Sequence, residues 1–157
     1  LFFFNDTANH EIYTLSLHDA LPIWGIPESE AADHFMDHPV GLIIEDEPYV
    51  RSPQQIKDQK MVFYCQVKEG MELHILDGGD IVSDTQKALE EKIAERGEKP
   101  KAIINFNCIL RTLELEKNGQ TQAYADLFKE IPTVGFSTYG EQYIGHINQT
   151  ATMVLLY

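Results

Sequence analysis

Residues 131–150 read IPTVGFSTYGEQYIGHINQT and gather three glycines, a carboxylate, a histidine and several side-chain amides into one short stretch. Over residues 134–138 larger residues alternate with smaller ones, as they do in a β-strand. Gly140 lies where such a strand has to turn, and Glu141 follows it directly. A carboxylate just after a strand end is poorly placed for the core and well placed for a site. The stretch therefore predicts a strand with glycine turns, which form either a plain β-hairpin or one wall of a site.

The second half of the chain predicts strands and helices that alternate around this stretch. The clearest helix spans 81–96, where an apolar stripe runs among Lys, Glu and Gln residues between an Asp80 N-cap and a stop at Gly97. The other expected elements are a buried strand at 101–106 that runs into Cys108, a segment at 109–117 with helical character at its start, an amphipathic helix at 120–131 and an apolar terminal strand at 151–157.

The first half predicts mainly short strands. Pro27 and its acidic neighbours suit the first turn of a short helix, which Pro39 ends. We expect strands at 40–44 and 49–51, a polar loop at 54–59, and a hairpin made by strands at 61–67 and 72–76. The whole pattern predicts an α+β fold with a mixed β-sheet, two main amphipathic helices and an N-terminal β-hairpin region.

Composition narrows the range of partners. The net charge is −13 and the isoelectric point is about 4.7, which argues against nucleic acid and anionic membrane as partners. Cys65 and Cys108 show no metal-ligand spacing and suggest a reducing compartment, so we expect a cytoplasmic protein. The histidines form no HxxH or HExxH pattern, and we expect neither a metal nor another cofactor.

Cys108 is the first candidate site residue, because it ends a buried strand and sheets of this kind open their sites at strand ends. A helix starting just after it would lower the pKa of its thiol, and Arg111 would act in the same direction. Such a thiol would contact a ligand or sense redox conditions. The alternative is a small buried apolar residue, which is the usual role of a free cysteine.

Three charged or titratable residues complete the candidate chemistry. A guanidinium at Arg111 and a carboxylate at Glu141 in one pocket would bind the carboxylate and the ammonium of an amino acid. The alternative is that they pair with each other in a structural salt bridge. His146 is either a base or a hydrogen-bonded structural residue. We expect Cys108, Arg111, Glu141 and His146 to converge in one cleft.

Three motifs resemble the C-terminal domain of the FIST family. TVGFSTYGE followed by GHINQTATMVLL resembles the end of that domain. Residues 103–111, IINFNCILR, are similar to its strand that ends in a cysteine followed three residues later by arginine. Residues 38–53, HPVGLIIEDEPYVRSP, carry its Pro-x-Gly and Val-Arg-Ser/Thr-Pro elements. The resemblance covers residues 24–157.

The resemblance implies a sensory domain of a signal-transduction protein that binds a small metabolite such as an amino acid. It also implies a companion FIST N-terminal domain and a chemotaxis-type or kinase output domain, and the variant of the cysteine motif is similar to bacterial members. The ligand-binding residues that it implies are Cys108, Arg111, Tyr139, Gly140, Glu141, His146 and Asn148.

The first 23 residues have a different character. Residues 5–23 closely resemble NDTATTEIYTLSLHDALPI, the translation of a common sequencing adapter. They lack the basic start and the apolar core of a signal peptide. We therefore expect residues 1–23 to be a non-native segment that the fold does not need, 24–157 to be the domain, and the preceding companion domain to be missing from this fragment.

Two other functions remain open at this stage. One is a cysteine-dependent enzyme with Cys108 as nucleophile and His146 as base, although no hydrolase or transferase signature surrounds the cysteine. The other is a protein-interaction scaffold.

Overall fold

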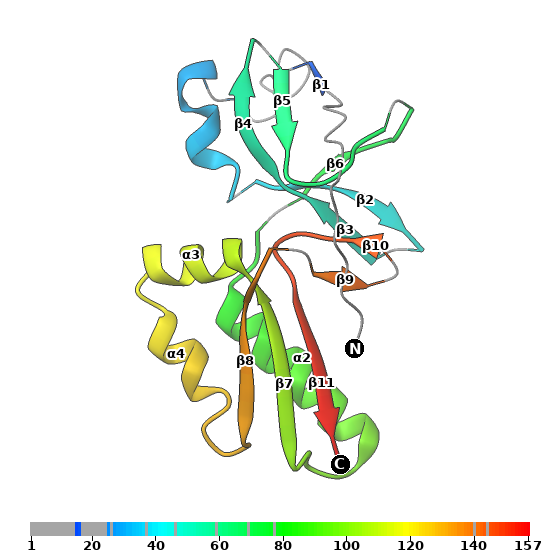
Figure 1. Ribbon diagram of the computed structural model, residues 1–157, viewed down its shortest axis with the longest axis vertical. Coiled ribbons are helices and arrows are strands. Elements are labelled where there is room, and N and C mark those ends of the chain that lie inside the picture. The colour runs from blue at the N-terminus through cyan, green and yellow to red at the C-terminus, as the bar shows by residue number, and fades with distance from the viewer. Residues whose placement is uncertain are drawn as a thin grey trace.

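The computed structural model describes residues 15–16, 25, 27–36, 38–45, 47–58, 60–68, 70–76, 78–139, 141–143 and 145–157. The described residues form a lower part, built on a three-stranded sheet with helices, and an upper part of short strands (Figure 1). The β-rich upper part and the helix-bearing lower part confirm the expected α+β class.

The lower sheet has the strand order β11-β7-β8. Its strands are β7 (Ala102–Cys108), β8 (Thr133–Thr138) and β11 (Ala151–Leu156). β8 is parallel to β7 and β11 is antiparallel to it, so the expected mixed sheet is confirmed. Both outer strands are edges among the described elements.

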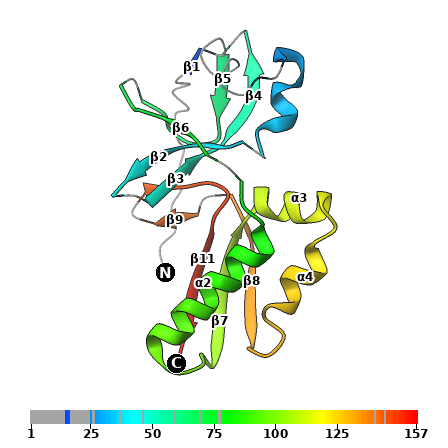
Figure 2. The same cartoon turned by 180° about the vertical axis from the view of Figure 1, so that it is seen from behind.

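The helix predicted at 81–96 is confirmed as α2 (Ile81–Arg96). Asp80 Oδ1 accepts a hydrogen bond of 2.7 Å from the Ser83 N–H, and Gly97 ends the helix in the left-handed conformation with φ 76°. α2 covers one face of the lower sheet, as Figures 1 and 2 show from opposite sides. The core on this face consists of Leu89, Ile103, Phe128 and Ile131.

The second long helix was expected at 120–131, and this expectation was too long. The segment expected as one long helix contains only the short helix α4 (Thr121–Asp126) among the elements found there. The helix before it, α3 (Ile109–Lys117), is a separate element. After α4 the chain continues in turns, in which the Phe128 N–H donates to the Ala125 carbonyl oxygen. The apolar residues after the helix still reach the core, because Phe128 and Ile131 are buried there.

The upper part contains the expected hairpin region, with two of its elements corrected. Its elements are η1, a 3-10 helix (Glu28–His34), β1 (Leu15–Ser16), β2 (Val40–Ile44), β3 (Glu47–Arg51), β4 (Pro53–Lys57), β5 (Lys60–Phe63), β6 (His74–Ile75), β9 (Gln142–Tyr143) and β10 (Gly145–His146). The loop expected at 54–59 is wrong, since most of it lies in β4. The hairpin expected between 61–67 and 72–76 is also wrong, because β5 pairs with β4 and β6 pairs with β2.

Within residues 1–23 the structure describes Leu15 and Ser16, which pair with Met61 and Lys60 of β5. The remainder of that segment lies outside the described residues, as does Trp24.

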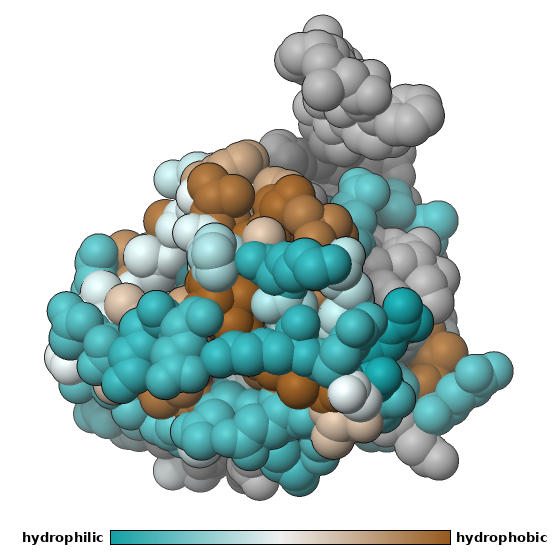
Figure 3. Space-filling view, turned by 90° about the horizontal axis from the view of Figure 1, so that it is seen from below, coloured by the Kyte–Doolittle hydropathy of each residue, from teal (hydrophilic) through white to brown (hydrophobic). Residues whose placement is uncertain are grey.

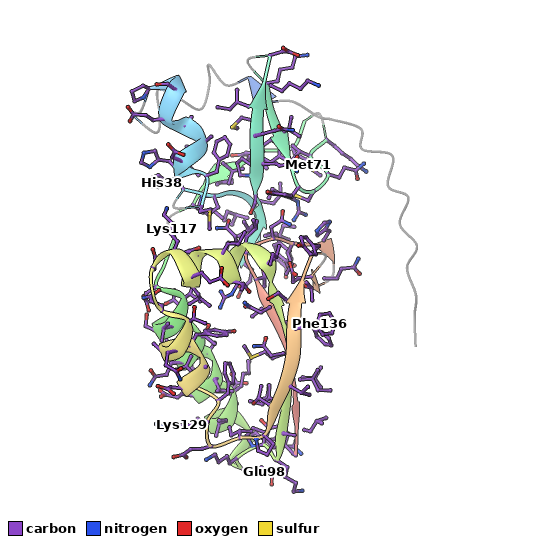
Figure 4. All side chains as sticks on the ribbon, turned by 60° about the vertical axis from the view of Figure 1, so that its left-hand side comes forward. His38, Met71, Glu98, Lys117, Lys129 and Phe136 are labelled. Atoms are coloured by element: carbon purple, nitrogen blue, oxygen red, sulfur yellow. The ribbon has the colours of Figure 1, made fainter. Side chains whose placement is uncertain are left out.

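The face of the lower sheet opposite α2 is apolar, and no described helix covers it. Val134, Phe136, Val154 and Leu156 are exposed there, and the Phe136 side chain is 66 % exposed. Figure 4 shows Phe136 pointing away from the helices, and in Figure 3 hydrophobic residues gather along the upper side of the view from below. Among the described helices, none is both long enough and apolar enough to cross a bilayer.

Candidate functional site

Cys108 and Glu141 lie together at the end of β7. Cys108 is the last residue of the strand and the N-cap of α3, and its side chain is buried. Its N–H donates to the Thr150 carbonyl oxygen over 2.9 Å, which ties it to the start of β11. Glu141 follows β8 and is only 3 % exposed. Its carboxyl group lies close enough to the Cys108 thiol to change the pKa of that thiol.

The expectation of a low thiol pKa at Cys108 was wrong. The helix α3 does begin directly after Cys108, but burial raises the pKa of the thiol, and the neighbouring Glu141 carboxyl raises it further. The backbone N–H groups of Leu110 and Gln149 oppose this rise without reversing it. A protonated buried thiol is a poor nucleophile, so this geometry does not favour a cysteine-dependent enzyme.

Glu141 is itself held in an environment that favours the neutral form. Burial raises the pKa of its carboxyl group. The Thr138 hydroxyl donates to Oε1, whereas Oε2 is buried without a well-formed hydrogen bond to any described residue. The Cys108 thiol is a weak hydrogen-bond donor to the same carboxyl group, and this interaction partly offsets the rise in the pKa of Glu141.

Glu141→Gln should change the pH dependence of stability with a defined sign. Because the folded pKa of Glu141 lies above its unfolded value, the free energy of unfolding of the parent falls as pH rises between those two values. The variant lacks this titration, so its stability relative to the parent should rise over the same window and then level off. Urea unfolding between acid and neutral pH measures this difference.

Glu130→Gln is the matched control. Lys99 lowers the pKa of the exposed Glu130 carboxyl group, so its relative stability should change in the opposite direction with pH. A Glu141→Gln difference that is flat with pH, or that falls as pH rises, would show that folding does not raise the pKa of the Glu141 carboxyl group.

Arg111 points away from the Cys108–Glu141 pair. Its Nε–H donates to Asn107 Oδ1 over 3.0 Å and its Nη2 donates to Thr85 Oγ1 over 2.8 Å. The guanidinium also lies 6.0 Å from the centre of the Tyr124 ring. No described carboxylate forms an ion pair with Arg111, so the alternative of an Arg111–Glu141 salt bridge does not occur among these residues.

His146 and Asn148 contact residues of the upper part just before the chain enters β11 of the lower part. The His146 carbonyl oxygen accepts from Arg51 Nη1, and buried Asn148 accepts the Ser52 N–H at Oδ1 over 3.1 Å. Gln149 also contacts the upper part, because its side chain accepts from the Ser52 hydroxyl over 2.9 Å and donates to the Met36 carbonyl oxygen over 3.0 Å.

The remaining expected site residues lie elsewhere. The Tyr139 side chain is 81 % exposed to solvent. Gly140 lies outside the described residues. The structure therefore brings Cys108 to Glu141, places Arg111 on the α2 side of the sheet, and uses His146 and Asn148 where the two parts meet.

A cavity of about 730 Å³ lies between α2 and β11, and Arg111 is part of its wall. The floor is apolar, whereas charged and polar groups stand at both ends. The lining residues are Asp84, Thr85, Ala88, Leu89, Lys92, Glu95, Arg96, Arg111, Gln149, Thr150, Ala151, Met153, Leu155 and Tyr157. Most of them were absent from the sequence-based site. The sequence carried one indication of this cavity wall: Thr85, Ala88 and Lys92 have the spacing of residues on one side of a helix.

Within the described part of the chain, no three His, Cys, Asp or Glu side chains cluster closely enough to hold a metal ion.

Comparison with known proteins gives one match. A family model described as FIST C domain matches residues 11–144, which includes β1 and ends before β11. No curated protein and no solved structure matches the chain.

Proposed function

The chain belongs to the FIST C domain family of signal-transduction sensory domains, and from this premise we propose that it senses a small ligand with a carboxylate group, bound between α2 and β11. Cavities for small molecules commonly measure about 300–1,000 Å³ and combine apolar walls with a few placed polar groups. The cavity along α2 meets both conditions. The observation that carries the proposal is Arg111, a cation in its wall with neutral hydrogen-bond partners.

Arg111 supplies the anion contact. Thr85 and Asn107 fix the guanidinium from two sides without neutralising it, so part of its planar fork remains for a carboxylate. Leu89 and Met153 line the adjoining floor and suit the apolar side chain of an amino acid such as leucine.

Asp84 is the candidate contact for a ligand ammonium group. The sequence-based expectation gave this role to Glu141, but burial raises the pKa of its carboxyl group and it is not among the residues that line the cavity. Asp84 precedes Thr85, the residue that accepts from Arg111, and lines the cavity beside it. An amino acid could therefore place its carboxylate on Arg111 and its ammonium on Asp84.

Gln149 offers a route from the ligand to the rest of the molecule. It lines the cavity, and its side chain is hydrogen-bonded to Ser52 and Met36 in the upper part. A ligand that moves Gln149 changes the contact between the two parts. This coupling between binding and the arrangement of the parts is what a sensory domain requires.

Ala88→Trp should block ligand binding without unfolding the protein. Ala88 is exposed and lines the cavity, so an indole ring there fills the space without entering the core. The measurement is the thermal shift caused by the common L-amino acids. A ligand at about 100 times its Kd adds about 2.7 kcal/mol to the parent, and this gain should be lost in the variant.

Ala94→Trp provides a matched control. Ala94 is also exposed on α2 but lies outside the cavity lining, so this variant should keep the full thermal shift. Equal shifts in both variants would place the ligand elsewhere, and the absence of a shift in the parent with every amino acid would reject amino acids as the ligand class.

A further inference from the structure

We propose that the cavity takes its ligand as an extended oligopeptide, which adds a strand to the outer edge of β11 and places its C-terminal carboxylate on Arg111. This inference rests on the proposed ligand site between α2 and β11 and names the ligand class more closely. Three features of the described residues support it: the free edge of β11, the length of the groove, and the position of its uncompensated cation.

The first feature is the backbone of β11. In an antiparallel pair, residues that hydrogen-bond to the neighbour alternate with residues whose N–H and C=O groups face away. The Cys108 N–H donates to the Thr150 carbonyl oxygen, and the register continues with Thr152 opposite Phe106. The backbone groups of Thr152 therefore face β7, whereas those of Ala151, Met153 and Leu155 face outward.

These outward-facing residues are the ones that line the cavity with their side chains. β11 has β7 on one side and no described strand on the other, so its outer N–H and C=O groups have no ladder partner among the described residues. Such an edge is a template for a further strand. The side chains beneath it would contact alternate residues of that strand, which is how strand addition obtains specificity.

The second feature is the shape of the groove. Figure 2 shows α2 in front of the sheet, with β11 at the edge. Along α2 the lining runs from Asp84 to Arg96, whose guanidinium lies 5.0 Å from the centre of the Tyr157 ring. At about 3.3 Å per residue, the six residues of β11 span about 20 Å. That length suits four to six extended residues better than a single amino acid.

The third feature fixes the direction of the peptide. A strand antiparallel to β11 ends beside the start of β11, where Thr150 and Arg111 line the cavity together. The C-terminal carboxylate then meets a guanidinium that has no described carboxylate partner. The apolar floor at Ala88, Leu89 and Met153 requires small or apolar side chains at alternate peptide positions.

The test compares N-acetylated tetrapeptides of alternating alanine and leucine, in both registers, with free L-leucine by titration calorimetry on the full chain. The better register should bind at least tenfold more tightly than leucine, and replacing its C-terminal carboxylate with an amide should cost at least tenfold. N-methylation of amides that face β11 should abolish binding, whereas N-methylation of the intervening amides should be tolerated. Ala88→Trp should abolish binding and Ala94→Trp should retain it.

The outcomes separate the two proposals. Leucine binding as tightly as either peptide, or a peptide that tolerates N-methylation at every position, overturns strand addition and leaves the small-ligand site standing. If neither leucine nor any of the peptides binds, both the amino-acid site and strand addition are overturned.

Discussion

Gly135→Ala is expected to lower the free energy of unfolding by more than about 3 kcal/mol, because the added methyl group would overlap the backbone of the neighbouring strand. Gly135 lies opposite Asn105 in the parallel ladder between β8 and β7. A Cβ atom at this position would collide with the Asn105 carbonyl oxygen. That oxygen belongs to the central strand of the lower sheet and cannot move aside as a flexible side chain can.

Relief of this overlap requires β8 to shift along or away from β7. Thr138, which donates to Glu141, is the last residue of the same strand, so the shift would also disturb the Cys108–Glu141 pair. Val134→Ala is the matched control, because its side chain is exposed on the same strand and its truncation should cost less than about 1 kcal/mol. Urea unfolding measures the loss of stability in both variants. Near-equal midpoints would show that β7 and β8 leave room for a methyl group at Gly135.

Arg111→Ala is expected to weaken binding of an amino acid by about ten- to a hundredfold, since a charge-assisted hydrogen bond contributes roughly 1.5–3 kcal/mol. The loss should appear with L-leucine and with 4-methylpentanoate, which keeps the carboxylate and lacks the ammonium. It should be absent with leucinamide, which lacks the carboxylate. Titration calorimetry with these three compounds therefore assigns the partner of Arg111 by its chemistry.

Arg111→Lys separates charge from geometry. It keeps the cation but loses the fork that Thr85 and Asn107 hold, so it should restore only part of the affinity. The ligand-free Arg111→Ala protein should lose only about 1 kcal/mol of stability, because the two bonds lost are partly exposed. A much larger loss, with leucine and leucinamide affected equally, would make Arg111 a structural residue.

The elements predicted well from the sequence are those whose signals are local. α2 has an acidic N-cap, a helical apolar stripe and a glycine stop within one segment, so both of its ends were predicted. β7 was expected as a buried strand running into Cys108, and the strand does end there. In both cases the residues that decide the element lie inside it.

The misses concern pairing between segments. β4 is polar at most of its positions and has no apolar alternation, so only its pairing with β5 makes it a strand. β6 lies next to β5 in sequence but pairs with β2, and short strands carry little information on which neighbour they choose. α4 is shorter than expected because the buried apolar residues after it, Phe128 and Ile131, lie in turns and not in the helix.

The candidate site was only partly predictable for the same reason. Strand ends indicated that Cys108 and Glu141 belong together, and the structure brings them into contact. The sign of the thiol pKa shift was missed because burial and a neighbouring carboxyl outweigh a helix terminus. The cavity was missed because one side of α2 and the inner side of β11 form it together, and neither carries a motif of its own.

The most direct test of a ligand site between α2 and β11 is the methyl spectrum of the protein labelled with 13C-methyl methionine during titration with L-leucine. Met153 lines the cavity, whereas Met61 is buried in β5 of the upper part and serves as an internal reference. We predict that the Met153 signal moves saturably with leucine, that Met61 stays in place, and that Ala88→Trp removes the movement. A Met153 signal that stays fixed while calorimetry shows leucine bound would contradict a ligand site between α2 and β11.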